Sequence, residues 1–254
     1  MKHTTRNLAR LGALGLAALL FAACSSGPAQ PSASLGNVTN RTIAPSIASI
    51  PLTDQHGATV TIGSFKSKTL LVVPFLTLCP DVCPFTTGNL LAVQASIDAA
   101  KQNKDVAILE LSVDPERDTP ERLAAYAKNV GASWTMAVAS VADTAVLMKY
   151  FGMTTEKMDA EAGSGVVDWM TGQPLAFDLA HSDGFSVINT EGVERFVSGA
   201  TPAFHGTLPS VLNTFLSEEG KATKADPPKN GWTPADALGA ISWVAGTNIP
   251  LATS

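Results

Sequence analysis

The chain has 254 residues, of which 45% are hydrophobic and 15% are charged, and its formal net charge is −5. That length and composition support one globular domain with a substantial core, whereas two full domains would be a tight fit. Lysines and arginines form no run beyond the first ten positions, which excludes a basic surface for nucleic acid and predicts no nucleic-acid partner.

The N-terminal segment has the features of an export signal. Lys2 and Arg6 precede an apolar run at 11–23, which ends in small residues before Cys24. The run is shorter than the ~20 residues of a membrane-spanning helix, so we expect 1–23 to be cleaved as a lipoprotein signal peptide. The residues before Cys24 resemble a bacterial lipobox, which predicts lipidation of Cys24, a membrane lipid anchor and an extracytoplasmic location. An ordinary signal-peptidase site is the alternative.

The chain has three cysteines, an odd number for an exported protein. Lipidation of Cys24 would leave Cys79 and Cys83 as a close pair in an oxidising compartment. A disulfide between Cys79 and Cys83 as a purely structural link is a weak alternative, because so small a loop restricts the unfolded chain little.

Composition divides the mature chain into three parts. Residues 24–48 are rich in Ser, Pro, Ala and Gly and predict a flexible tether. The folded domain is expected at 49–218. Residues 219–254 read as a linker and a tail of unknown structure, and the apolar end of the tail is open to three interpretations: a helix packed back on the domain, a partner-binding segment, or disorder.

The first half of the domain alternates strands and helices. After a short hairpin around the turn at 55–57, three apolar strands are each followed by a helix. Thr119-Pro120 and Ser140 supply helix starts, and Gly131 and Gly152 supply helix ends. The predicted strands are 69–76, 105–113 and 134–139, and the helices run to about Ala100, Val130 and Gly152.

The second half is less regular. Residues 153–178 carry several glycines and predict a long excursion or a small hairpin. A hairpin follows around Thr190-Glu191-Gly192, and then a final helix at 208–217. This element order predicts an α/β, thioredoxin-like fold: a central mixed sheet flanked by helices, with an inserted irregular excursion before the last hairpin.

The cysteine pair lies where a buried strand gives way to a helix. Cys79 and Cys83 are four residues apart, so both sulfurs point to one side of a helical turn and reach one ion. A helix N-terminus also favours the thiolate, which is both a metal ligand and a nucleophile. The pattern therefore predicts either metal binding or disulfide exchange.

A histidine near the two cysteines would favour metal binding over disulfide exchange. Thiolates select monovalent copper or zinc, and two sulfurs with one imidazole suit copper in either oxidation state, whereas zinc would need a fourth ligand. Of the four histidines, His3 leaves with the signal, His56 lies in a predicted turn and His205 precedes the last helix. His181 is the candidate, because it begins the segment HSDGFSVIN, which would neighbour the cysteine-bearing strand.

Three motifs resemble those of the Sco/SenC family of copper proteins: F-x-T-x-C-P-D-V-C-P at 75–84, S-V-D-P-E-R-D-T-P-E at 112–121, and a later histidine followed by Ser182. The resemblance covers 50–217. It implies a thioredoxin-like fold, copper, as Cu(I) or Cu(II), bound by Cys79, Cys83 and His181, and a role in maturing the binuclear copper centre of cytochrome c oxidase.

The resemblance also implies supporting acids around the ligands. Asp114 matches a family acid near the copper site, although an Asp-Pro helix entry explains it equally well. Many relatives carry Asp directly before the histidine, whereas here the acid is displaced to Asp178, which leaves the partner of His181 open.

Two functions follow from this site, and a third is weaker. The first is a metallochaperone that passes copper to the copper-bearing subunit of cytochrome c oxidase, served by a thiol reductant or another copper chaperone. The second is an enzyme, a thiol-disulfide oxidoreductase acting through Cys79 and Cys83. A copper sensor or store would rest on the methionines, which are better explained as packing residues.

Overall fold

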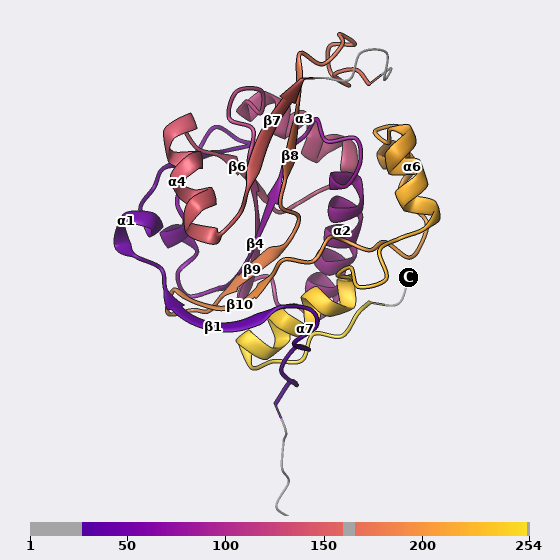
Figure 1. Cartoon of the computed structure of the whole chain (residues 1–254). Coiled ribbons are helices and arrows are strands. Elements are labelled where there is room, and N and C mark those ends of the chain that lie inside the picture. The colour runs from indigo at the N-terminus through magenta and orange to yellow at the C-terminus, as the bar shows by residue number, and fades with distance from the viewer. Residues whose placement is uncertain (1–26, 160–165, 253–254) are drawn as a thin grey trace, which may run out of the picture.

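The computed structural model describes residues 27–159 and 166–252, and its centre is an eight-stranded mixed sheet (Figure 1). The strand order is β1-β10-β9-β4-β5-β6-β2-β3. The strands are β1 (Asn37–Thr42), β2 (Leu52–Asp54), β3 (Thr59–Val60), β4 (Thr69–Phe75), β5 (Val106–Ser112), β6 (Thr135–Val138), β9 (Phe185–Ile188) and β10 (Val193–Ser198). The mixed sheet and its flanking helices confirm the predicted fold class.

The middle of the sheet is its parallel part. Every residue of β4 is buried, and β4 pairs with β5 along its full length, from Thr69 opposite Val106 to Phe75 opposite Ser112. β6 continues the parallel order beside β5. A continuous run of branched apolar residues suits a strand that is covered on both faces, which is why the sequence predicts these strands well.

Helices cover both faces of the sheet. Figure 1 shows α2 (Cys83–Ala99) and α3 (Pro120–Val130) on one side, and α1 (Pro45–Ala48) and α4 (Val141–Phe151) on the other. The hydroxyls of Thr119 and Ser140 cap α3 and α4, as their positions predict. Both helices end at a glycine with a positive φ. A short 3-10 helix, η1 (Ile62–Phe65), leads into β4.

The N-terminal edge of the sheet differs from the prediction. The sequence places 24–48 in a flexible tether, but β1 pairs with β10 in an antiparallel ladder. Arg41 on β1 also forms an ion pair with the buried carboxylate of Glu194 on β10, at 2.7 Å. These contacts are long-range, so the local composition of β1 gives no sign of them.

The irregular excursion contains a two-stranded ribbon. β7 (Thr155–Asp159) pairs with β8 (Phe177–His181) in antiparallel register, from Thr155 opposite His181 to Asp159 opposite Phe177. The ribbon stands apart from the main sheet at the top of Figure 1. It brings the end of β8 back toward the carboxyl end of the parallel strands.

The C-terminal segment belongs to the folded domain. Of the three interpretations of the tail, the structure has the helix that packs back: α7 (Pro234–Ala245) contacts α2, β4 and β9. The side chain of Trp232, just before α7, is fully buried. The segment predicted as a linker contains α6 (Glu218–Ala225), and the predicted final helix is reduced to α5 (Ser210–Asn213).

The predicted signal peptide and Cys24 lie outside the described residues. None of the helices among the described residues is both long enough and apolar enough to span a membrane.

Candidate metal centre

The two cysteines lie where β4 gives way to α2. Residues 76–82, here called the metal-binding loop, connect the two elements, and Cys83 is the first residue of the helix. The Sγ of Cys79 accepts a hydrogen bond from the backbone N–H of Cys83 at 3.4 Å. A sulfur therefore accepts from the first backbone N–H of α2, and Cys79 stays beside Cys83 although residues 79–82 are not helical.

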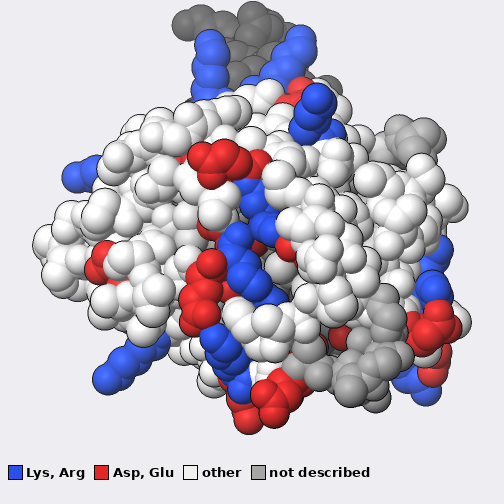
Figure 2. Space-filling view, turned by 90° about the horizontal axis from the view of Figure 1, so that it is seen from above, with Lys and Arg blue, Asp and Glu red and all other residues white. Residues whose placement is uncertain are grey.

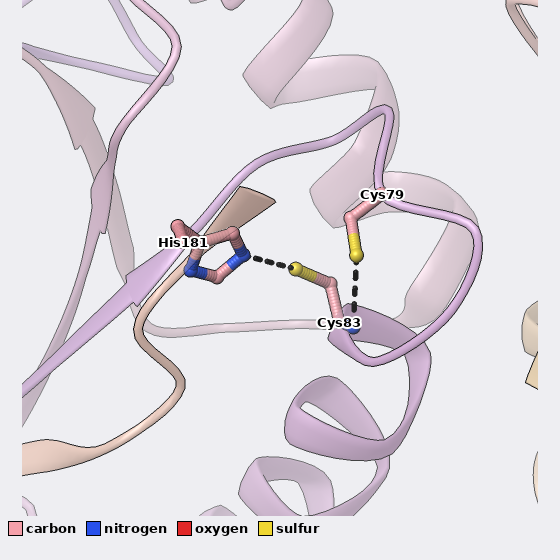
Figure 3. A group of neighbouring side chains, drawn as sticks. All are labelled: Cys79, Cys83 and His181. Carbon is pink, nitrogen blue, oxygen red and sulfur yellow. Dashed lines mark hydrogen bonds between the residues drawn. The ribbon is translucent and has the colours of Figure 1, made fainter. Parts of the chain in front are cut away.

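His181 reaches the cysteines from the end of β8. Its Nε2 lies 3.4 Å from the Sγ of Cys83. Figure 3 shows the imidazole edge pointing at the sulfur of Cys83, with the sulfur of Cys79 on the far side of Cys83 from the ring. One donor atom from each of Cys79, Cys83 and His181 lies within 4.8 Å of the others, so the structure brings the three predicted ligands together.

The other ring nitrogen of His181 is held by the segment that follows it. Nδ1 lies 2.8 Å from the carbonyl oxygen of Ser182 and 3.8 Å from Oδ1 of Asp183. A carbonyl only accepts, so Nδ1 carries the proton and donates to it, which leaves the Nε2 lone pair facing the sulfurs. This is the tautomer that a metal ligand requires.

The pKa values of the two cysteines are shifted in opposite directions. Hydrogen bonding from the Cys83 thiol holds the pKa of Cys79 well below its usual value, against the opposing effect of burial, and His181 adds to the lowering. Burial raises the pKa of Cys83 well above its usual value, and the nearby Cys79 raises it further. Cys79 is therefore the member of the pair that ionises more readily, and Cys83 is the member that keeps its proton longer.

An acid that the sequence interpretation did not single out lies beside His181. Burial alone would lower the pKa of His181, but the charges of Cys79 and Asp183 raise it overall. Burial raises the pKa of Asp183 to about 6. The sequence analysis places the supporting acid before the histidine, at Asp178, whereas in the structure the acid follows the histidine by two residues, in the motif His-Ser-Asp.

The two acids predicted to support the ligands bind elsewhere. Asp114 is buried and accepts from Nε of Arg117 at 2.5 Å. The carboxylate of Asp178 accepts from the backbone N–H of Leu179. Within 27–159 and 166–252, neither carboxylate has a hydrogen bond to a cysteine sulfur or to His181, so Asp183 takes the position expected for Asp178.

Cys79 and Cys83 are not joined by a disulfide in this structure. Cys79 is partly exposed, whereas Cys83 is buried and the side chain of His181 is 4% exposed. A cleft of about 260 Å³ opens beside Cys79, with Trp169 and Phe215 among its walls. Cys79 is thus the cysteine of the pair that is open to solvent.

The face of the molecule seen from above has no large patch of a single charge in its described part. Figure 2 shows acidic and basic side chains intermixed in a central band, with mostly uncharged surface on either side. This distribution agrees with the absence of basic runs in the sequence.

Comparison with known proteins gives one consistent result. The family model described as SCO1/SenC matches residues 43–192. Protein SenC of Rhodobacter capsulatus is 36% identical over 107 residues, which is 42% of this chain and 42% of that protein. The matched region likewise spans less than half the length of the other leading curated relatives.

Two solved structures resemble this chain. The apo Sco1 protein of Thermus thermophilus covers 65% of this chain and 87% of its own, with 23% identity and a TM-score of 0.50. The ScoI of Bradyrhizobium japonicum, described with copper bound, has 27% identity and a TM-score of 0.49, and the match covers 65% of this chain and 93% of its own. The fold is thioredoxin-like, and the family model covers more than half of the sequence. The chain therefore belongs to the SCO1/SenC family.

Proposed function

We propose that this protein binds one copper ion through Cys79, Cys83 and His181 and acts in the assembly of cytochrome c oxidase, by passing the ion to the copper-bearing subunit. The observation that carries the proposal is the convergence of two sulfurs and one imidazole nitrogen within 4.8 Å. Membership of the SCO1/SenC family supports the role in oxidase assembly.

The donor set fits copper better than other common ions. Two thiolates are soft ligands, and a soft set with one imidazole suits copper, whereas structural zinc takes four protein ligands. Among the described residues, this group holds three donors. In this proposal copper is the ion that the protein delivers. A site with fewer protein ligands than a structural zinc site also makes release of the copper ion easier.

Exposure sets the order in which ligands exchange. Cys79 is the partly exposed member of the set, while Cys83 and the His181 ring are buried. An incoming thiolate or imidazole of the recipient would bond to copper as the bond from Cys79 breaks. Cys83 and His181 would hold the ion until a second recipient ligand arrives.

The location belongs to the proposal as well. We place the protein outside the cytoplasm, anchored to the bacterial membrane by a lipid on Cys24. Support comes from the basic start, the apolar run and the small residues before Cys24. Replacement of Cys24 by Ser should move the protein from the membrane fraction to the soluble extracytoplasmic fraction. Unchanged membrane attachment would remove this part of the proposal.

A second function is favoured by the unequal thiols. A low-pKa, partly exposed Cys79 next to a buried Cys83 is the arrangement of a dithiol reductant. The Cys79 thiolate would attack a disulfide of the recipient, and Cys83 would then displace the recipient sulfur. The recipient leaves as a dithiol, and Cys79 and Cys83 leave as a disulfide.

One experiment separates the two functions. The copper-loaded protein is mixed with a purified copper-free recipient domain, and both copper and thiols are counted on each partner. A chaperone transfers copper while the recipient thiols stay reduced throughout. A reductase converts a recipient disulfide to thiols in the absence of copper, and it keeps that activity in His181→Ala. His56→Ala, an exposed histidine in the β2–β3 turn, is the control for both arms.

A further inference from the structure

The metal-binding loop has little support from its own sequence. The residue before α2, Val82, makes no side-chain capping hydrogen bond among the described residues. Pro80 and Pro84 have no N–H to donate. Support from elsewhere in the chain is therefore needed to hold Cys79 at a fixed distance from Cys83.

That support comes from residues 215–220, here called the brace segment, at the start of α6. The backbone N–H of Ser217 donates to the carbonyl oxygen of Pro80 at 3.0 Å. The hydroxyl of Ser217 also donates to Oδ1 of Asp81, which lies between the two cysteines. The same hydroxyl caps α6 by accepting from the backbone N–H of Gly220 at 3.0 Å. One side chain thus ties the helix start to the metal-binding loop.

Packing at Gly220 is closer than any other residue would allow. A Cβ built on Gly220 would lie 2.6 Å from the carbonyl oxygen of Pro80 and 3.2 Å from the Cα of Asp81. Both are backbone atoms of the metal-binding loop, so a side chain at 220 would have to displace the loop itself. The glycine marks the place where the first turn of α6 rests on the loop.

The brace segment is itself anchored to the core. The ring of Phe215 stacks on Tyr126, with centroids 5.7 Å apart, and lies 5.7 Å from the ring of Trp169. Trp169 donates from Nε1 to the carbonyl oxygen of Thr77 at 2.8 Å. The loop is therefore held from two sides, by the brace segment at Pro80 and Asp81 and by Trp169 at Thr77.

We propose that the brace segment positions the metal-binding loop, with Ser217 and Gly220 as its positioning residues, so that their loss weakens copper binding although every ligand remains. The role of copper here rests on the proposed function. The family match ends at residue 192, so the brace segment lies outside it. The last two residues of the brace segment, including Gly220, belong to the segment that the sequence predicts to be a linker.

Two pairs of variants test the proposal. Gly220→Ala is compared with Gly239→Ala in α7, where an added Cβ meets no described atom within 4 Å. Ser217→Ala is compared with Ser140→Ala, which removes the same kind of cap from α4. A helical glycine changed to alanine gains helix propensity, so propensity alone would make Gly220→Ala more stable than wild type.

The readout is copper(I) affinity, measured by competition with a chelator, together with thermal unfolding of each copper-free variant. We expect Gly220→Ala and Ser217→Ala to bind roughly tenfold more weakly than wild type, a typical loss for a partner that orients a ligand. Gly239→Ala and Ser140→Ala should bind like wild type. Equal affinity in all four variants would overturn the proposal.

A second readout needs no copper. In the reduced, copper-free protein, Cys83 is buried and should react slowly with a thiol reagent. Displacement of the loop should speed that reaction several-fold in Gly220→Ala and Ser217→Ala, and leave it unchanged in the two controls. If wild type failed to bind copper, the proposed function would fail, and this reaction rate would still decide the role of the brace segment. Unchanged rates in all variants would overturn that role.

Discussion

The Nε2 atom of His181 lies 3.4 Å from the Sγ of Cys83, although the two residues are 98 positions apart in the chain. The contact exists because β7 and β8 form a ribbon that ends at His181, beside the start of α2. The metal-binding loop and the β7–β8 ribbon leave the sheet at different places and meet at this contact. Their relative position sets the metal-binding geometry.

Asp183 should support copper binding through His181. In Asp183→Asn, the imidazole loses the negative charge beside Nδ1, and its basicity as a ligand falls. We expect copper affinity to drop about tenfold, measured by chelator competition. Asp178→Asn is the matched control and should bind like wild type, because Asp178 bonds to the backbone of Leu179. A larger loss of copper affinity in Asp178→Asn than in Asp183→Asn would show that Asp178 is the acid that supports His181.

Glu110 should make stability depend on pH. Burial in the middle of β5 raises the pKa of Glu110 to about 8, against an ordinary value of 4.5, although Trp134 donates a 2.7 Å hydrogen bond to it. The folded state then holds the proton more tightly than the unfolded state. Its contribution is complete below pH 4.5 and is lost as pH rises through about 8.

The test of this contribution is urea unfolding at pH 5 and pH 9. Wild type should lose on the order of 4 kcal/mol between these values from Glu110. Glu110→Gln keeps an acceptor for Trp134 and has no proton to lose, so this loss should disappear. Burial also raises the pKa of Asp118, to about 6, and its slope has the same sign and stays in the variant. An equal loss in both proteins would contradict the assignment.

The C-terminal segment should contribute to the stability of the whole domain. Trp232 is fully buried, with its ring edge against Phe185 at 5.4 Å between centroids. Trp232→Ala should cost about 3–5 kcal/mol in the free energy of unfolding, as large core truncations do. Trp243 on α7 is only partly buried, so Trp243→Ala should cost much less. Similar, small losses in both variants would mean that the segment is not part of the cooperative unit.

The parallel core and its helices were predictable because their signals are local. β4 is a continuous apolar run, and Thr119 and Ser140 cap their helices with their own hydroxyls. The turn around Gly192 likewise fixes the hairpin of β9 and β10 within a few residues.

The parts that the sequence did not predict depend on distant partners. β1 is polar and mostly exposed, and it forms a strand because it pairs with β10 at the edge of the sheet. The sequence of α6 is typical of a linker. Only the fold shows that Ser217 and Gly220 contact the metal-binding loop. The three ligands were identified from their chemistry and from the family resemblance, but the acid beside His181 was not, because only the fold shows which neighbour faces Nδ1.

X-ray absorption at the copper edge tests the central claim most directly, because it counts the atoms bound to the metal. Wild type loaded with one copper(I) should give two sulfur scatterers and one nitrogen scatterer. His181→Ala should lose the nitrogen, and Cys83→Ser should lose one sulfur. A nitrogen signal that persists unchanged in His181→Ala, or a wild-type site with fewer than two sulfurs, would contradict the assignment of Cys79, Cys83 and His181 as the copper ligands.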